Sequence, residues 1–333
     1  MKHANVAFFI PHIGCPNKCS FCDQNTISGK QNIPSVNEIK ETVKNALNTL
    51  PKNVLIDSEI AFFGGSFTAI DRNLMISFLE SVKEFIGKDK FKGIRISTRP
   101  DAIDDEILLL LKKYNVTSIE LGAQSMSDDV LFKNMRGHSS DDVVLASKLI
   151  KKHGFSLGLQ MMTGLYADSE EGAFLTAEKF ISLKPDTVRI YPTVVLKGTY
   201  LEKLYVEGKY IPFDVDKTVS VCAKLLDLFE RNSIKVIRVG LHDQPSLKDN
   251  LVAGAYHPAL GELIMGEQLY LKALDIINGQ TTPQKDLVLL INSTFVSQLI
   301  GQNKRNISRF KALGYNVTVK SDNSLKEKTI KLI

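Results

Sequence analysis

The stretch "NVAFFIPHIGCPNKCSFCDQ", residues 5–24, joins a short apolar run to a loop that holds three of the chain's four cysteines. The run at residues 5–10 is rich in β-branched and aromatic side chains, which predicts a strand. Cys15, Cys19 and Cys22 follow it within eight positions. A closed four-coordinate metal site needs one ligand more than these thiols supply. The stretch therefore predicts a first strand followed by a thiol loop whose fourth ligand is not evident.

Strand-like and helix-like patterns alternate from this stretch to about residue 270. Ser35 and Glu38 have the spacing of a capping box, and Asn73 resembles the start of a second helix. The strands expected after the first are at residues 58–67, 93–100, 118–125, 155–164 and 186–195, and the helices between them at 35–50, 73–87, 104–115, 140–154 and 169–183. This alternation predicts an α/β fold with a parallel sheet of six strands, as a barrel or partial barrel.

Composition indicates a soluble protein of 333 residues, with 44% hydrophobic and 24% charged residues. The first apolar run is too short to be a signal peptide or to cross a bilayer, so we expect a cytoplasmic protein without a membrane segment. Four cysteines, three of them clustered, do not form the pattern of a secreted disulfide framework. Cys222 lies in an amphipathic helical pattern and is expected to be a small buried residue.

Positive charge is concentrated at the end of the chain. The net charge is +5, yet residues 281–333 contain seven Lys and two Arg against three acidic residues. This region reads as strand, helix, loop, helix, strand. We therefore expect two domains, a barrel with its extension at residues 1–275 and a small basic βααβ domain at residues 284–333. A basic domain indicates a polyanion partner, although such surfaces can also serve solubility alone.

Clustered thiols favour two kinds of metal site. One is a zinc site completed by His12 or by a distant residue. The other is a cubane iron-sulfur cluster with three irons held by Cys15, Cys19 and Cys22 and the fourth iron open. In the second case the absent fourth cysteine is the position at which a reacting group binds.

The spacing of the three cysteines, with Phe21 before the last of them, resembles the signature of the radical S-adenosylmethionine (SAM) superfamily. This resemblance implies a partial (β/α)6 TIM-like barrel, a 4Fe-4S cluster and SAM as cofactors. It also implies that an electron from the cluster splits SAM into methionine and a 5'-deoxyadenosyl radical, which abstracts hydrogen from a substrate. An electron donor such as flavodoxin or ferredoxin is the expected partner.

A glycine-rich motif after the second strand is also similar to the superfamily pattern. The resemblance implies that Gly64, Gly65 and Ser66 approach the methionine end of SAM, since glycine backbone allows close contact. A tight turn would explain the two glycines equally well. The superfamily often has Glu where Ser66 stands, which limits that contact to the backbone.

Five motifs occur in order along the chain: "ISTRPD", "IELGAQSMSDDVL", "MRGHS", "MMTGL" and "RIYPTVVLKGTYLEKLYVEGKY". Over roughly residues 5–215 the chain resembles the Elongator catalytic subunit in these motifs, and it resembles oxygen-independent coproporphyrinogen oxidase more weakly. The residues that this resemblance places around cofactor and substrate are Ser97, Arg99, Gln124, Arg136, His138, Gln160 and Tyr191. Arg99 could instead cap a helix or form a rim salt bridge, and Glu120 could be an internal hydrogen-bond partner. His242, Asp243, His257 and Glu262 could face substrate or lie in a surface loop.

The resemblance to the Elongator subunit stops short of its acetyltransferase domain, so we do not transfer its acetyl-CoA-dependent uridine modification. The basic region resembles a KH core, whose loop grips RNA backbone. Ile300, Gly301 and Ile307 match the KH loop, but Lys304 replaces its second glycine. Lys304 and Arg305 add charge that attracts phosphate. RNA is therefore an expected partner, and a degenerate KH-like module used only for packing is the alternative.

The leading hypothesis is a radical SAM enzyme that cleaves its cofactor and abstracts hydrogen from a substrate, with RNA as the substrate considered first. One alternative is an RNA-binding iron-sulfur protein that does not cleave SAM. The other is a radical SAM enzyme that acts on a small molecule or tetrapyrrole.

Overall fold

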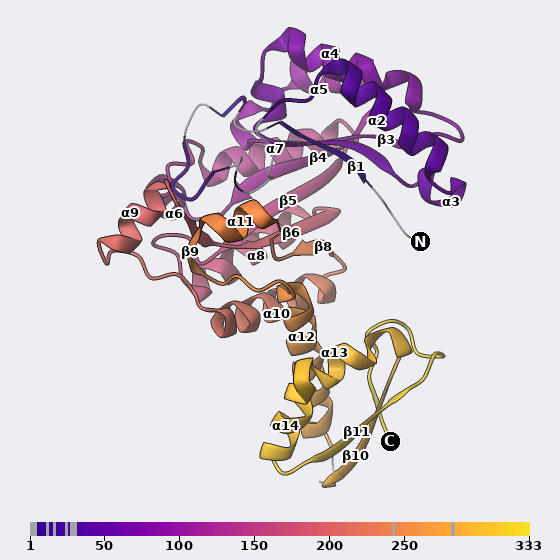
Figure 1. Ribbon diagram of the computed structural model, residues 1–333, viewed down its shortest axis with the longest axis vertical. Coiled ribbons are helices and arrows are strands. Elements are labelled where there is room, and N and C mark those ends of the chain that lie inside the picture. Colours follow the sequence, from indigo (N-terminus) through magenta and orange to yellow (C-terminus); the bar gives the residue numbers. More distant parts are fainter. Residues whose placement is uncertain are drawn as a thin grey trace.

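The fold is built on one curled sheet of seven parallel strands (Figure 1). The computed structural model describes residues 5–10, 13–15, 18–23, 26, 32–241, 244–280 and 284–333. In spatial order the strands are β1 (Asn5–Ile10), β2 (Glu59–Gly64), β3 (Gly93–Thr98), β4 (Val116–Gln124), β5 (Ser156–Thr163), β6 (Thr187–Pro192) and β8 (Lys235–Val239). β1 and β8 are the two edges, so the sheet forms an open half-barrel. The predicted α/β class with a partial barrel is confirmed.

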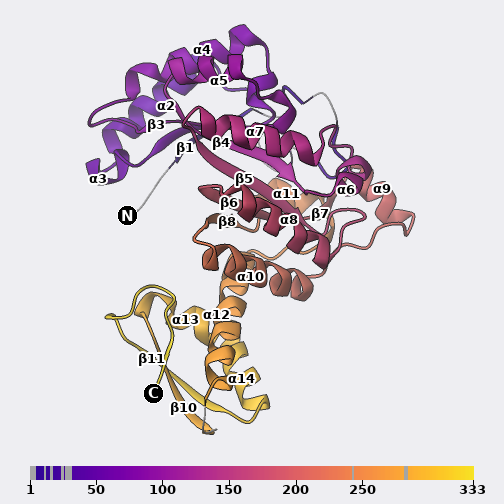
Figure 2. The same ribbon diagram turned by 180° about the vertical axis from the view of Figure 1, so that it is seen from behind.

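Helices cover the outer, convex face of this sheet (Figure 2). They are α2 (Val36–Thr49), α3 (Lys52–Leu55), α4 (Arg72–Val82), α5 (Asp105–Lys113), α7 (Ser140–Lys152), α8 (Glu170–Leu183) and α10 (Val215–Arg231). Alternate strand residues face them and are almost fully buried, among them Ile60, Phe62, Ile94, Ile96, Ile119, Leu121, Leu157, Val188 and Ile190. Each such side chain contributes about 1.5–3 kcal/mol by leaving water, which holds the helices on this face.

Helix starts follow the capping rules, with one correction. Ser35 and Glu38 form the predicted capping box of α2, with each side chain bonded to the other residue's backbone N–H. The second helix begins earlier than predicted, because Asp71, not Asn73, is its N-cap and accepts from the N–H of Leu74. A carboxylate at this position satisfies a free donor and also faces the positive end of the helix dipole.

The end of the sheet differs from the prediction of six strands. The expected strand at residues 186–195 is divided into β6 and β7 (Val194–Leu196), and β7 pairs antiparallel with β9 (Leu251–Gly254). A seventh strand, β8, pairs with β6. It was not expected because Lys235 and Arg238 interrupt its apolar pattern, and these two charged side chains face the open interior of the half-barrel.

Shorter elements surround the carboxyl ends of the strands. They are α6 (Asp128–Lys133), α9 (Tyr200–Val206) and α11 (Pro245–Asn250), with 3₁₀ turns at Phe67–Ala69 and Pro100–Ala102; a further 3₁₀ turn at Lys83–Phe85 lies at the opposite end, before β3. α6 and α9 pack their buried faces against Cys19 and Phe21 of the thiol loop. The loop is therefore supported from outside the half-barrel.

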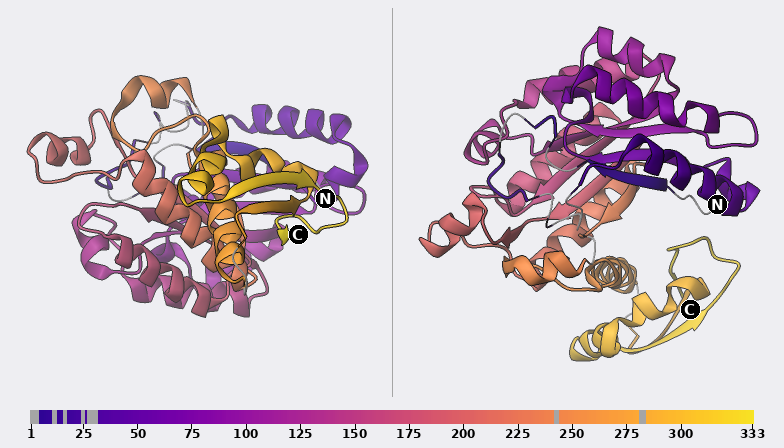
Figure 3. Two further views of the ribbon diagram at one scale, coloured as in Figure 1. Left: turned by 90° about the horizontal axis from the view of Figure 1, so that it is seen from below. Right: turned by 45° about the horizontal axis from the view of Figure 1, so that its top comes forward.

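The long helix α12 (Leu260–Asn278) joins the half-barrel to a smaller unit, seen apart from the sheet in Figure 3. The smaller unit comprises β10 (Asp286–Ile291), α13 (Val296–Ile300), α14 (Arg305–Ala312), β11 (Asn316–Ser321) and β12 (Lys331–Leu332), with 3₁₀ turns at Ser293–Phe295 and Gln302–Lys304. β10 lies between β11, which is parallel to it, and β12, which is antiparallel. This is the predicted βααβ order with one added strand.

α12 belongs to two hydrophobic cores. Leu260 and Ile264 in its first half pack in the core of the half-barrel. Leu269, Ala273 and Ile277 in its second half pack with the residues of β10, α13 and α14. The expected division into residues 1–275 and 284–333 stays a prediction. Among the described residues, no helix is long and apolar enough to cross a membrane.

Candidate functional site

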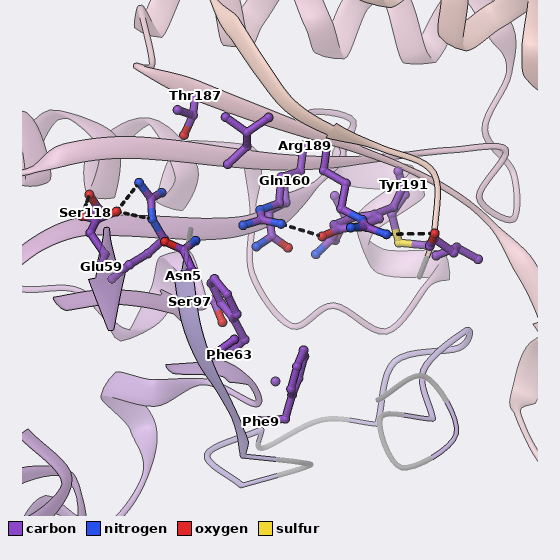
Figure 4. A pocket seen from close by; sticks show the side chains of 18 of the residues that line it. Asn5, Phe9, Glu59, Phe63, Ser97, Ser118, Gln160, Thr187, Arg189 and Tyr191 are labelled. Atoms are coloured by element: carbon purple, nitrogen blue, oxygen red, sulfur yellow. Dashed lines mark hydrogen bonds and ion pairs between the residues drawn. The ribbon is translucent and has the colours of Figure 1, made fainter. Parts of the chain in front are cut away.

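The inner face of the half-barrel encloses a cavity of about 830 Å³, which we call the half-barrel cavity. Side chains from all seven strands line it, and Figure 4 shows Gln160, Arg189 and Tyr191 pointing into the same space. Polar and charged residues at inward positions keep this face from packing as a dry barrel core. A concave space of this size, lined by aromatic and charged groups, has the features of a ligand site.

A buried ionic network forms one wall of the cavity. The Arg95 guanidinium donates to Glu59 Oε2 at 2.7 Å and to Glu120 Oε1 at 3.0 Å. Arg189 donates to both carboxylate oxygens of Glu120, at 2.6 and 3.0 Å. Burial alone would raise the pKa of Glu59, but Arg95 and the hydroxyls of Thr117 and Ser118 outweigh it and hold that pKa below its ordinary value. The network therefore fixes the arginines on this wall.

Gly158 makes this arrangement possible. A Cβ at this position would lie 2.8 Å from Glu120 Cγ and 3.1 Å from Thr187 Oγ1. The absence of a side chain on β5 lets Glu120 reach across from β4 to Arg189 on β6. The same carboxylate also accepts from Gln160 Nε2 at 3.1 Å.

The thiol loop lies at the carboxyl ends of the strands. Cys19 Sγ accepts a hydrogen bond from Arg136 Nη1 at 3.0 Å, and the other arm of this guanidinium donates to Gly122 O at 2.6 Å. Ser20 links the loop to its supports, since its N–H donates to Asn134 O and its carbonyl accepts from the N–H of Leu201. These contacts hold the loop between α6 and α9.

The three thiols influence one another. Burial raises the pKa of Cys22 to about 12, with a further rise from Cys19, and the pKa of Cys15 is also raised by burial and by Cys19. Three thiols within one loop are a donor set suited to a soft metal centre, whose charge would favour the thiolates. Within the described ranges, no three Cys, His, Asp or Glu side chains are arranged to hold a metal ion. The assignment of the ligands stays a prediction.

The two glycines after β2 allow the thiol loop to lie against the sheet. Gly65 N donates to Ile10 O at 2.8 Å, and Ser66 N donates to Ile13 O at 3.0 Å. A Cβ on Gly65 would lie 1.9 Å from Ile13 O, and Gly64 has a φ of +114°. Gly65 is therefore required for close approach of the loop, and Gly64 for its backbone conformation.

Ser66 and Arg99 support the site from behind the wall. Ser66 Oγ lies 2.9 Å from Thr98 Oγ1 and accepts from Arg99 N at 3.2 Å. The Arg99 side chain donates to both oxygens of Asp101, at 2.9 and 3.0 Å. Its third nitrogen, Nη1, is buried and has no hydrogen-bond partner among the described residues. An unsatisfied buried donor is costly, and this one identifies a place for an acceptor from a ligand.

Gln124 gives the clearest indication of a ligand. Its backbone has a φ of +69°, which is rare for a residue with a side chain. Its Oε1 is buried without a partner in the part of the chain that the structure describes, and the residue lines the half-barrel cavity. A strained backbone and an unpaired amide oxygen occur together at the carboxyl end of β4. Such strain is often found at functional positions.

His138 is a buried neutral histidine. Burial, with a further contribution from Arg136, lowers its pKa to about 4. Its Nε2 lies 3.2 Å from Ala123 O, the carbonyl that precedes Gln124. The ring therefore supports the end of β4 from outside the cavity.

The structure brings most of the predicted site residues together. Those that line the half-barrel cavity are Phe21, Cys22, Gly64, Ser97, Gln124, Gln160 and Tyr191. Gly65, Ser66 and Arg99 are not among the residues that line it. His12, His242 and Asp243 lie outside the described residues. His257 Nδ1 accepts from Ala259 N near the start of α12, and Glu262 lines a different pocket, so these two do not join the cavity.

Several cavity residues were not predicted from the sequence. Glu59, Arg95, Arg189 and Arg238 line the cavity, and each lies within or at the end of a strand. Charged residues at alternate positions of otherwise apolar strands could have identified them, because a parallel sheet buried on both faces is normally apolar throughout.

Two family models match the chain in succession. The model of the radical SAM superfamily matches residues 9–177, which is more than half of the chain. The chain belongs to the radical SAM superfamily. A model of the radical SAM C-terminal domain matches residues 185–269.

Individual relatives agree with this assignment. An uncharacterized protein of Methanocaldococcus jannaschii is 32% identical over 65% of this chain and 69% of its own length. A tRNA uridine(34) acetyltransferase of Dehalococcoides mccartyi is 24% identical over 75% of this chain and 62% of its own. The solved structure of archaeal Elp3 from Methanocaldococcus infernus has a TM-score of 0.64 at 21% identity, covering 84% of this chain and 64% of that one. The chain therefore spans 62% to 69% of the length of these proteins.

This radical SAM protein is thus an enzyme whose fold is shared with Elp3, and the predicted resemblance to Elongator-type proteins is confirmed. The superfamily uses SAM and a 4Fe-4S cluster. The reaction and substrate of this chain are a separate question.

Proposed function

We propose that Cys15, Cys19 and Cys22 bind a 4Fe-4S cluster whose fourth iron is left for SAM, and that the chain cleaves SAM and abstracts hydrogen from a substrate. The observation that carries this proposal is a loop of three thiols whose Cys22 lines the same cavity as Gln124, where the buried Oε1 has no partner among the described residues. When bound, the cluster and SAM would supply an electron and a 5'-deoxyadenosyl radical.

The chain's own contribution is to position the cofactor and exclude water. Gln124 Oε1 and Arg99 Nη1 are buried groups that lack a partner in the described part of the chain, and a bound polar cofactor would satisfy them. The proposed cofactor contacts inside the cavity are Phe21, Gly64, Ser97, Gln124, Gln160 and Tyr191, with Gly65, Ser66 and Arg99 behind them. Enclosure by the sheet would protect a radical from solvent.

The test is anaerobic reconstitution with iron and sulfide, followed by addition of dithionite and SAM. We expect about four irons per chain and formation of 5'-deoxyadenosine. Replacing Cys15, Cys19 or Cys22 with Ala should remove cluster and product together. Cys222→Ala is the matched control, because Cys222 is fully buried on α10 away from the loop and contacts Thr163. An intact cluster without 5'-deoxyadenosine would leave the RNA-binding iron-sulfur protein as the better description.

The electron donor is proposed to be a small redox protein such as flavodoxin or ferredoxin. Superfamily members need such a donor, and dithionite only replaces it. Reduced flavodoxin or ferredoxin should therefore support formation of 5'-deoxyadenosine when dithionite is omitted.

RNA is the first candidate substrate. A relative is a tRNA uridine(34) acetyltransferase, and residues 281–333 contain nine cations against three acidic residues. Deuterated RNA and a deuterated small-molecule extract should each be incubated with the reduced enzyme and SAM. Deuterium in 5'-deoxyadenosine from RNA alone supports this substrate.

A small-molecule or tetrapyrrole substrate is the second candidate. The observation in its favour is that three of the nine cations are paired with carboxylates of the rest of the chain. These pairs are Arg305 with Asp216, Arg309 with Glu267, and Lys328 with Glu230. Transfer of deuterium from the small-molecule extract alone would select this candidate over RNA.

A further inference from the structure

Arg238 lines the half-barrel cavity and, like Lys92 and Lys235, has no carboxylate partner among the described residues. The Arg238 guanidinium donates only to backbone carbonyls, through Nε to Gly240 O at 3.2 Å and through Nη2 to Leu241 O at 3.0 Å. Over the described ranges, the structure gives it no ion pair. Arg95 and Arg189, by contrast, are each paired with Glu120.

A β-bulge directs Arg238 into the cavity. The pairing of β6 with β8 runs from Val188 with Val236 to Arg189 with Arg238, so Ile237 is an extra residue on β8. Under strict alternation the inward residues of β8 would be Lys235, Ile237 and Val239, and Arg238 would face the helices. With the bulge, Lys235, Ile237 and Arg238 all line the cavity. Bulges next to active sites commonly redirect a side chain in this way.

The position is unfavourable for a cation in the absence of a ligand. Burial lowers the pKa of Arg238, and Arg189, directly opposite on β6, lowers it further. Like charges at opposed positions of neighbouring strands repel each other. An unpaired charge at such a place is a cost to the fold that binding of an anion would remove.

The two carboxylates of the buried ionic network are already engaged. Glu59 accepts from Arg95, Thr117 and Ser118, and Glu120 accepts from Arg95, Arg189 and Gln160. Neither can turn to Arg238 without breaking buried hydrogen bonds. Neither carboxylate of this network is therefore available as a counter-charge for Arg238, whereas the open cavity can admit one.

Tyr191 adds a second donor. Its hydroxyl accepts from Arg189 Nη1 at 3.4 Å, which leaves its own proton to be donated. Tyr191 lines the cavity and is close enough to influence the pKa of Arg238. A guanidinium and a hydroxyl together match the oxygens of a carboxylate or phosphate.

We propose that Arg238, with the Tyr191 hydroxyl, binds a carboxylate or phosphate group of the substrate in the half-barrel cavity. This inference rests on the proposed function where it calls the bound molecule a substrate. Binding of the anion itself needs no cleavage of SAM. The enzyme would thereby act on an anionic molecule and hold it by that group at the β6 and β8 side of the cavity.

The test measures the melting temperature of the cluster-reconstituted protein with inorganic phosphate or acetate, against chloride at equal ionic strength. Both oxyanions should raise it more than chloride does, because a ligand of the folded state stabilises that state. In Arg238→Gln, about 10- to 100-fold more oxyanion should be needed for the same rise in melting temperature, since a hydrogen bond to a charged group is lost. Arg238→Lys should retain part of it.

Arg231→Gln is the matched control, since Arg231 lies on α10 with its side chain 67% exposed and outside the cavity. It should respond like the unmodified protein. An equal oxyanion response in Arg238→Gln would overturn the site. So would an absent response in the unmodified protein.

A second arm separates the two sources of the anion, because SAM also carries a carboxylate. The phosphate response should persist when SAM is saturating. If SAM abolishes it, the site belongs to the cofactor and the assignment to substrate is wrong. Failure of the proposed function would appear separately, as a lack of 5'-deoxyadenosine in a protein that still responds to phosphate.

Discussion

Gly65 is the residue on which the seating of the thiol loop depends. A methyl group there would lie 1.9 Å from Ile13 O, which is backbone and cannot rotate away. We expect Gly65→Ala to lower the free energy of unfolding by about 2 kcal/mol or more and to reduce the iron bound on reconstitution. Urea unfolding and iron analysis would measure both.

The control for Gly65 is Gly261→Ala. Gly261 lies in α12, and a Cβ there would be 3.5 Å from Val239 O, an ordinary contact. Alanine should be neutral or stabilising by about 0.5–1 kcal/mol in a helix. Equal losses in the two variants would show that the close approach at Gly65 is unimportant.

His138 should make stability depend on pH. Its pKa is about 4 in the folded protein against 6.5 ordinarily, so between these values the unfolded chain binds the proton more readily. Stability should therefore fall as the pH is lowered from about 6.5 to 4, by at most about 3 kcal/mol from this residue. In His138→Gln this part of the slope should disappear. Urea unfolding at pH 4.5, 5.5 and 7 tests the claim, and an unchanged slope in the variant would contradict it.

Single residues differ in how far sequence could predict them. Gln124 was predicted at the cofactor and lines the cavity, because it ends a strand that precedes a loop. For Arg99 a salt bridge was one alternative to a cofactor contact, and its guanidinium does pair with Asp101 two residues on. That choice depends on tertiary packing and leaves only one nitrogen for a ligand.

At the scale of elements, Arg309 is one of several contacts that hold α14 to α12, beside the Phe310 ring on Tyr270 and the hydrogen bond from Asn306 to Gly266 O. The guanidinium carbon of Arg309 lies 3.6 Å from the centre of the Tyr270 ring, and the guanidinium nitrogens Nη1 and Nη2 donate to the two oxygens of Glu267. Arg309→Ala would leave a largely buried Glu267 without its partner, so we expect a loss of about 1–3 kcal/mol in the smaller unit. Hydrogen exchange should quicken in α14 and β10 and stay unchanged in β3 and β4.

Arg231→Ala provides a comparison for this prediction. Arg231 pairs with Asp227 on the exposed side of α10, and its side chain is 67% exposed. An exposed pair contributes about 0–1 kcal/mol. If Arg231→Ala quickens exchange in α14 as much as Arg309→Ala does, the stacking on Tyr270 is not what holds the helix.

The elements that sequence predicted are those with a regular period. The strands from β1 to β6 were predicted, as were α2, α4, α5, α7 and α8, because each has an apolar face for the convex side, whereas the short helices α3 and α6 were not. β7 and β9 were missed, since Val194–Leu196 continues the apolar run of β6 and only Pro192 marks the change. β8 was missed because the bulge and two cavity-facing cations hide its alternation.

For the whole molecule, the distribution of charge shows which cations of the smaller unit serve packing and which are left for RNA or solvent. Arg305, Arg309 and Lys328 are paired with carboxylates on α10 and α12. Lys304, Lys311 and Lys320 are exposed, and no ion pair involving them is present in the described residues. Docking of the unit therefore uses a third of its cations and leaves the others for solvent or a polyanion.

Lys304 is the cation best placed to test RNA binding, because it is exposed in the loop between α13 and α14 and has a left-handed backbone. If this loop contacts RNA phosphate, Lys304→Ala should lower the slope of log affinity against log salt by about 1. Asp216→Asn should raise RNA affinity, since it releases Arg305 from its 2.9 Å ion pair. Lys88→Ala, at an exposed turn before β3, should change neither quantity. Filter binding of tRNA at several salt concentrations measures all three, and an unchanged slope in Lys304→Ala would assign the loop to packing.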